Sequence, residues 1–144
     1  MTDIISKSIY TAHVSVQGGR AGRARSDDGH IDLPLARPGQ GTATNPEQLL
    51  AAGWGACFQS ALAVAAKGSD IDVRDSVVEV AVTLGAMESG VYAVKAAIEV
   101  YLPHAALEKA QRLVERTHEI CPYSRATRGN IEATVRAVGH LGMY

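Results

Sequence analysis

The longest uncharged run in the sequence lies at 48–66, and the residues around it are typical of a helix. Asn45 is a favourable N-cap residue, Pro46 suits the first turn, and Gly68 can end the helix. Because the run is apolar nearly all round, we expect this helix to be buried on most sides. One stripe at helical spacing would face the core, formed by Leu50, Trp54, Cys57, Ala61 and Val64.

Alternation of apolar and polar residues predicts strands on both sides of this helix. The expected strands lie at 9–16, 20–26, 31–35, 78–84, 94–102 and 131–137. A second, amphipathic helix is expected from Pro103 to Cys121, where Pro122 ends it, and residues 123–129 are expected to form a loop. The order βββαββαβ indicates an α+β fold with mostly antiparallel sheets.

The composition is that of an ordinary globular protein, with 144 residues and 47% hydrophobic residues, and it favours one domain spanning 1–144. A net charge of -1 gives no reason to expect a nucleic acid or an anionic membrane as partner. The first ten residues lack the apolar run of a signal peptide. The uncharged run contains glycines and many alanines, so we expect a core helix and no membrane span. We infer a cytoplasmic protein.

The two cysteines, Cys57 and Cys121, both lie on faces that should pack against the interior. In the cytoplasm such a pair is more often catalytic, redox-active or metal-binding than structural. A reactive cysteine must be a thiolate, whereas burial raises the pKa of a thiol, so a cation is needed nearby. The candidate cations are Arg20, Arg128 and His118.

Several short motifs resemble those of the organic hydroperoxide resistance (Ohr) proteins of the OsmC-like superfamily. They are GGR at 18–20 with GR at 22–23, NPEQL at 45–49 followed by AAG at 51–53 and ACF at 56–58, and CPYS at 121–124 with ATRGNI at 126–131. The tyrosine in CPYS favours the Ohr branch over its OsmC relatives. The sequence departs from the family pattern at Arg125, where a small polar residue is usual, and at Ala21, where an acidic residue is common.

The resemblance implies the OsmC-like fold, with a buried central helix, in an intertwined homodimer. It further implies a thiol peroxidase that reduces organic hydroperoxides to alcohols. Cys57 would be the peroxidatic cysteine, Cys121 the resolving cysteine, Arg20 the activating arginine and Glu47 its carboxylate partner. No bound cofactor is implied, and the electrons would come from dihydrolipoamide, a lipoylated protein or another dithiol.

The composition around Cys57 favours an organic substrate over hydrogen peroxide. Three aromatic side chains would bind it, namely those of Trp54, Phe58 and Tyr123. No metal site is expected.

Three alternatives compete with this interpretation. A thiol–disulfide exchange enzyme would need a C-x-x-C site, which the sequence lacks. A zinc site formed by Cys57, His118 and Cys121 would lack an obvious fourth nitrogen or sulfur ligand. The main alternative is a non-catalytic redox-sensing or binding domain with the OsmC-like fold, because a fold alone does not determine a function.

Overall fold

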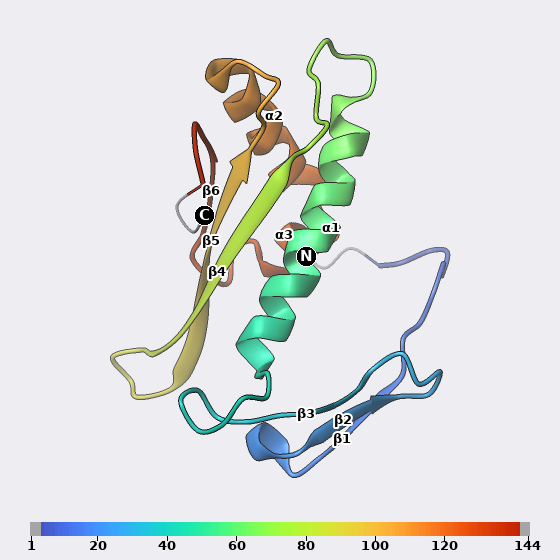
Figure 1. Cartoon of the computed structure of the whole chain (residues 1–144), viewed down its shortest axis with the longest axis vertical. Helices are drawn as coiled ribbons and strands as arrows, with labels where there is room; N and C mark the ends of the chain where they lie inside the picture. The colour runs from blue at the N-terminus through green and yellow to red at the C-terminus, as the bar shows by residue number, and fades with distance from the viewer. Residues whose placement is uncertain (1–3, 142–144) are drawn as a thin grey trace. The chain divides into compact units, whose positions relative to one another are not determined.

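The computed structural model describes residues 4–141. Its helices and strands form an α+β protein (Figure 1). The elements are β1 (Val14–Gln17), the short 3-10 helix η1 (Gly19–Ala21), β2 (Arg23–Ser26), β3 (Asp32–Pro34), α1 (Pro46–Ala66), β4 (Val77–Ala86), β5 (Tyr92–Tyr101), α2 (Leu107–Ile120), α3 (Pro122–Thr127) and β6 (Ala133–Val138). The predicted fold class is confirmed, and α3 is an addition to the predicted order.

The described residues form two compact units, one ending at Pro46 and the other beginning at Glu47. In the N-terminal unit, β1, β2 and β3 form an antiparallel sheet in that order. The strand predicted at 9–16 is shorter than expected, because β2 offers β1 only the four partners from Arg23 to Ser26. The prediction of a single domain spanning 1–144 stays a prediction.

In the second unit, β4, β5 and β6 form a mixed sheet in that order. The long hairpin β4–β5 is antiparallel over ten residue pairs, whereas β6 lies parallel to β5. A parallel neighbour requires a crossover connection, and α2 with α3 supplies it. Val80, Ile98 and Val135 are paired across the three strands and therefore share one face of the sheet.

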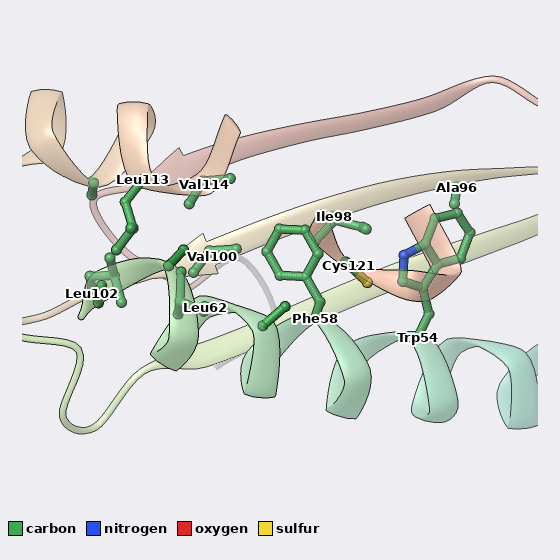
Figure 2. Packing of buried hydrophobic residues seen from close by; sticks show 14 residues of the cluster. Trp54, Phe58, Leu62, Ala96, Ile98, Val100, Leu102, Leu113, Val114 and Cys121 are labelled. Carbon is green, nitrogen blue, oxygen red and sulfur yellow. The ribbon is translucent and has the colours of Figure 1, made fainter. Parts of the chain in front are cut away.

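Helices α1 and α2 both cover this face, and the core of the unit lies between them and the sheet. Figure 2 shows Trp54, Phe58 and Leu62 on successive turns of α1, pointing toward β5. The buried cluster joins these side chains to alternate residues of β5 and to the inner face of α2. Cys121 belongs to the same cluster, so the second cysteine is part of the core.

The prediction that α1 is buried on most sides is wrong for the single chain. Only 33% of its most apolar window is buried, and Val64, assigned to the core stripe, is 56% exposed. The buried stripe is turned toward Phe58 and Leu62 instead. By length and composition α1 could also cross a membrane, a test that core helices of soluble proteins pass as well.

The second predicted helix also differs from the structure at both ends. Pro103 lies in a turn, and α2 begins at Leu107. Cys121 has extended backbone angles, φ -63° and ψ 124°, as expected for a residue before proline. Pro122 ends α2 and at the same time starts α3, because proline fits the first turn of a helix. The segment predicted as a loop at 123–129 is therefore largely helical.

Candidate active site

The two cysteines lie side by side in the second unit. Cys57 comes from the middle of α1 and Cys121 from the junction of α2 and α3. Both are free thiols, and the Cys121 S–H donates to the Cys57 sulfur across 3.8 Å. Cys121 is fully buried, whereas Cys57 is partly exposed. The sequence prediction that both sulfurs point into one shared interior agrees with this geometry.

A buried hydrogen bond fastens α3 to α1 beside the cysteines. The indole Nε1 of Trp54 donates to the Ser124 hydroxyl oxygen across 3.2 Å, and both side chains are completely inaccessible. Because an unpartnered buried indole N–H is costly, this bond favours one placement of α3 on the helix. The bond therefore fixes the junction that carries Cys121.

Tyr123 contacts α1 at two points. Its backbone N–H donates to the Cys57 sulfur. Its ring lies on Gly53, where an added Cβ would be 3.4 Å from both Cε2 and Oη. The side chain remains 42% exposed.

Within this unit the Cys57 thiol has no strong activation. Burial raises its pKa above the ordinary value, and the neighbouring Cys121 raises it further, while the Tyr123 N–H acts in the opposite direction. The thiol form therefore predominates near neutral pH unless a cation approaches the sulfur.

Two of the three candidate cations do not meet this need. Burial and the nearby Arg128 lower the pKa of His118, so its imidazole is neutral at pH 7. Arg128 donates from Nη2 to the His118 carbonyl oxygen across 2.6 Å. It thus binds the carbonyl end of α2, where helices leave acceptors unpaired and favour positive charge.

The third candidate, Arg20, lies on η1 in the N-terminal unit. The turn that carries it depends on glycine, since Gly18 and Gly19 have φ of 81° and 60°. A Cβ at Gly22 would lie 1.7 Å from the Gln17 carbonyl oxygen. Glu47 lies in the first turn of α1 and begins the second unit. The roles of Arg20 and Glu47 stay predictions.

Of the three aromatic residues predicted to bind substrate, the structure exposes Tyr123 alone. Trp54 and Phe58 are fully buried and pack in the core. A direct contact of either ring with a substrate stays a prediction. Among residues 4–141, no group of three or more His, Cys, Asp or Glu side chains is arranged to hold a metal ion.

Sequence reasoning included Ser124 and Gly53 in the motifs but assigned no role to either residue. The motif did not reveal what the serine does, because its role depends on an indole 70 residues away. The glycine did carry a signal: a glycine inside a helical pattern often marks close packing.

Comparisons with known proteins place this chain in a family. A model of the family described as OsmC-like protein matches residues 39–136. The organic hydroperoxide resistance protein OhrB of Bacillus subtilis is 46% identical over 87% of this chain and 95% of its own length. The organic hydroperoxide resistance protein of Xanthomonas axonopodis pv. citri is 38% identical over 90% of this chain and 94% of its own.

Solved structures show the same similarity. The crystal structure of Bacillus subtilis OhrB has a TM-score of 0.84 and 42% sequence identity, and it covers 91% of this chain and 100% of its own. That of an organic hydroperoxide resistance protein from Elizabethkingia anophelis has a TM-score of 0.81 and 37% identity, covering 92% and 99%.

The fold and the adjacent free thiols define an α+β protein with a cysteine pair between its two long helices. The chain belongs to the OsmC-like family and, within it, to the organic hydroperoxide resistance proteins.

Proposed function

We propose that this protein is a thiol peroxidase that reduces organic hydroperoxides to alcohols. The observation that carries the proposal is the pair of free sulfurs 3.8 Å apart, one partly open and the other fully buried. A peroxide can approach the partly exposed Cys57 sulfur, whereas burial shields the Cys121 sulfur from direct attack by peroxide. The names of the relatives, organic hydroperoxide resistance proteins, support the choice of substrate class.

The proposed reaction has two steps on these sulfurs. The Cys57 thiolate attacks the outer peroxide oxygen, the O–O bond breaks, and the inner oxygen leaves as an alcohol after it takes a proton. Cys57 is then a sulfenic acid. The Cys121 sulfur attacks it, the S–O bond breaks, and water leaves as the disulfide forms. Because Cys121 already touches Cys57, closure competes well with further oxidation to the irreversible sulfinic acid.

Arg20 would supply the missing positive charge. Full ionisation of an ordinary thiol increases the amount of thiolate only about 30-fold near neutral pH. A larger gain must come from a guanidinium that donates to the peroxide oxygens as charge develops on them. Glu47 would orient this guanidinium, because a carboxylate can accept two hydrogen bonds from arginine.

The apolar surroundings of Cys57 suit an organic substrate. Tyr123 would line the approach, and the rings of Trp54 and Phe58 would form the apolar wall behind the sulfur. The product disulfide would be reduced by thiol exchange with a dithiol, for which dihydrolipoamide or a lipoylated protein is the expected class. This cycle suits the reducing cytoplasm.

A homodimer is part of the proposal, and the outer face of α1 supports it. Val64 is 56% exposed and Leu49 is 38% exposed. Ala52, Ala56 and Ala63 are exposed too, on a helix without charge between Glu47 and Lys67. Such an apolar face marks an interface. Sedimentation velocity should give a dimer for the native chain and a smaller species for Val64→Asp.

Steady-state kinetics test the substrate class. Turnover should be followed with dihydrolipoamide as reductant and with either cumene hydroperoxide or hydrogen peroxide as oxidant. We expect a higher kcat/KM for cumene hydroperoxide, because it gains apolar contacts that hydrogen peroxide lacks. Equal values for the two oxidants would rule out an apolar substrate site.

A further inference from the structure

The contact between Gly53 and Tyr123 lies next to the reactive sulfur. An added Cβ at Gly53 would be 3.4 Å from Cε2 and Oη of the tyrosine and 3.7 Å from Cζ. A methyl group would thus just touch the ring, and a larger side chain would overlap it. Glycine in a helix interior is destabilising by about 0.5–1 kcal/mol relative to alanine, so a glycine here calls for an explanation.

Helix geometry brings Cys57 to the same spot. Gly53 precedes Cys57 by four residues on α1, so the two lie on one face, one turn apart. Helical side chains lean toward the N-terminus, and the Cys57 side chain therefore leans over the turn that contains Gly53. The Tyr123 backbone N–H contacts that sulfur as well. The ring and the sulfur consequently share one patch of the helix surface.

We propose that Gly53 is a specificity-determining position, because its bare backbone lets the Tyr123 ring pack against α1 one turn from Cys57 and leaves room for a bulky hydroperoxide. A larger side chain at this position pushes the ring outward, across the approach to the sulfur. The loss then grows with the size of the oxidant. This inference rests on the proposed peroxidase function and adds a determinant of substrate size.

The test compares the rate constants of Cys57 oxidation by cumene hydroperoxide and by hydrogen peroxide. In Gly53→Val the ratio of the two should fall about tenfold or more, the scale at which one added methylene acts in a pocket. In Gly53→Ala the fall should be smaller, because the methyl group meets the ring only at contact distance. Adding Gly53→Val to Tyr123→Ala should leave the ratio of Tyr123→Ala unchanged, since the ring is then absent.

Gly55 offers a matched control on the same helix. A Cβ there would also lie 3.4 Å from its nearest neighbour, but that neighbour is Val80 Cγ2 on β4. Gly55→Val should therefore alter stability without altering the ratio. An equal fall in Gly55→Val, or an unchanged ratio in a Gly53→Val protein with native circular dichroism, would overturn the proposal.

A second readout separates this inference from the peroxidase function itself. In a Cys121→Ser background, Cys57 is the remaining thiol, and its alkylation by iodoacetamide and by N-phenylmaleimide can be compared by mass spectrometry. Gly53→Val should slow the bulky maleimide more than the small iodoacetamide. If the native protein consumes no organic hydroperoxide, the proposed function fails, and the alkylation ratio alone decides the role of Gly53.

Discussion

The sulfur of Cys121 lies 3.8 Å from the sulfur of Cys57, with both cysteines reduced. A disulfide needs about 2.05 Å between the sulfurs, so closure requires a movement of less than 2 Å along an existing contact. The two residues are 64 positions apart in the sequence, and the packing of α3 on α1 brings them together. The chemistry of the pair therefore depends on the fold as much as on the residues themselves.

The two cysteines should not be equivalent. Cys57→Ser should abolish peroxide consumption, because the sulfur open to the substrate is gone. Cys121→Ser should allow a single sulfenic acid to form on Cys57, which dimedone then traps for detection by mass spectrometry. Peroxide reduction by Cys57→Ser at the native rate would show that the roles are assigned wrongly.

The pH dependence of Cys57 should reveal Arg20. Burial raises the pKa of Cys57 within its own unit. Without a nearby cation, alkylation of the thiolate therefore requires a higher pH than for an ordinary cysteine. If Arg20 approaches the sulfur, the pH at which iodoacetamide alkylation reaches half its maximal rate is lower in the native protein than in Arg20→Ala. The same midpoint in both proteins would place the activating charge elsewhere.

Glu47 should act through Arg20. Arg20→Ala should lower kcat/KM about 100-fold, the scale of one preorganised donor. Glu47→Gln should lower it less, and the double variant should resemble Arg20→Ala alone, because residues that act as a unit are not additive. Simple additivity in this cycle would make Glu47 an ordinary acidic residue at the start of α1.

The bond between Trp54 and Ser124 should contribute measurably to stability. Ser124→Ala leaves a fully buried indole N–H without its acceptor, which costs about 1–3 kcal/mol. Urea unfolding measures this loss, and Ser60→Ala, at an exposed serine of α1, is the control. A change in Ser124→Ala no larger than that in Ser60→Ala would mean that the bond does not hold α3.

His118 should make the fold sensitive to mild acid. Burial and Arg128 lower its pKa, with a smaller opposing effect of Glu119, so the folded state resists protonation. Above about pH 6.5, the ordinary histidine pKa, folded and unfolded chains are both neutral at this residue and it has no effect on stability. As the pH falls below that value, the unfolded chain binds the proton first and stability declines.

His118→Gln removes this contribution. Its free energy of unfolding should therefore fall less between pH 7 and pH 5 than that of the native chain. The exposed Ser60→Ala, which removes no titratable group, should follow the native curve. Parallel curves for the native protein and His118→Gln would contradict the lowered pKa.

The sequence predicted the fold class and most strands, because binary patterning and glycine turns are local signals. The prediction was wrong where contacts between residues far apart in the sequence determine the local structure. Pro122 reads locally as a helix end, yet the bond from Trp54 to Ser124 supports a new helix directly after it. The outer face of α1 was predicted to be buried, because apolar residues in a helical pattern do not reveal which of them the core of the chain covers.

The candidate site was also predicted only in part. The motifs around Cys57 and Cys121 identified both sulfurs, and their contact confirms that they share one interior. The charge around them was harder to predict. Arg128 was a candidate cation by position in sequence, but the end of α2 binds it. A long flexible side chain goes to the strongest nearby acceptor, which sequence spacing does not reveal.

A single-turnover thiol titration tests the central claim most directly. The reduced protein is mixed with one equivalent of cumene hydroperoxide without reductant, and free thiols, alcohol product and disulfide-linked peptides are measured. The account predicts one alcohol formed, two thiols lost and one intramolecular disulfide between Cys57 and Cys121 for each chain. Unchanged thiols with the peroxide still present would contradict it.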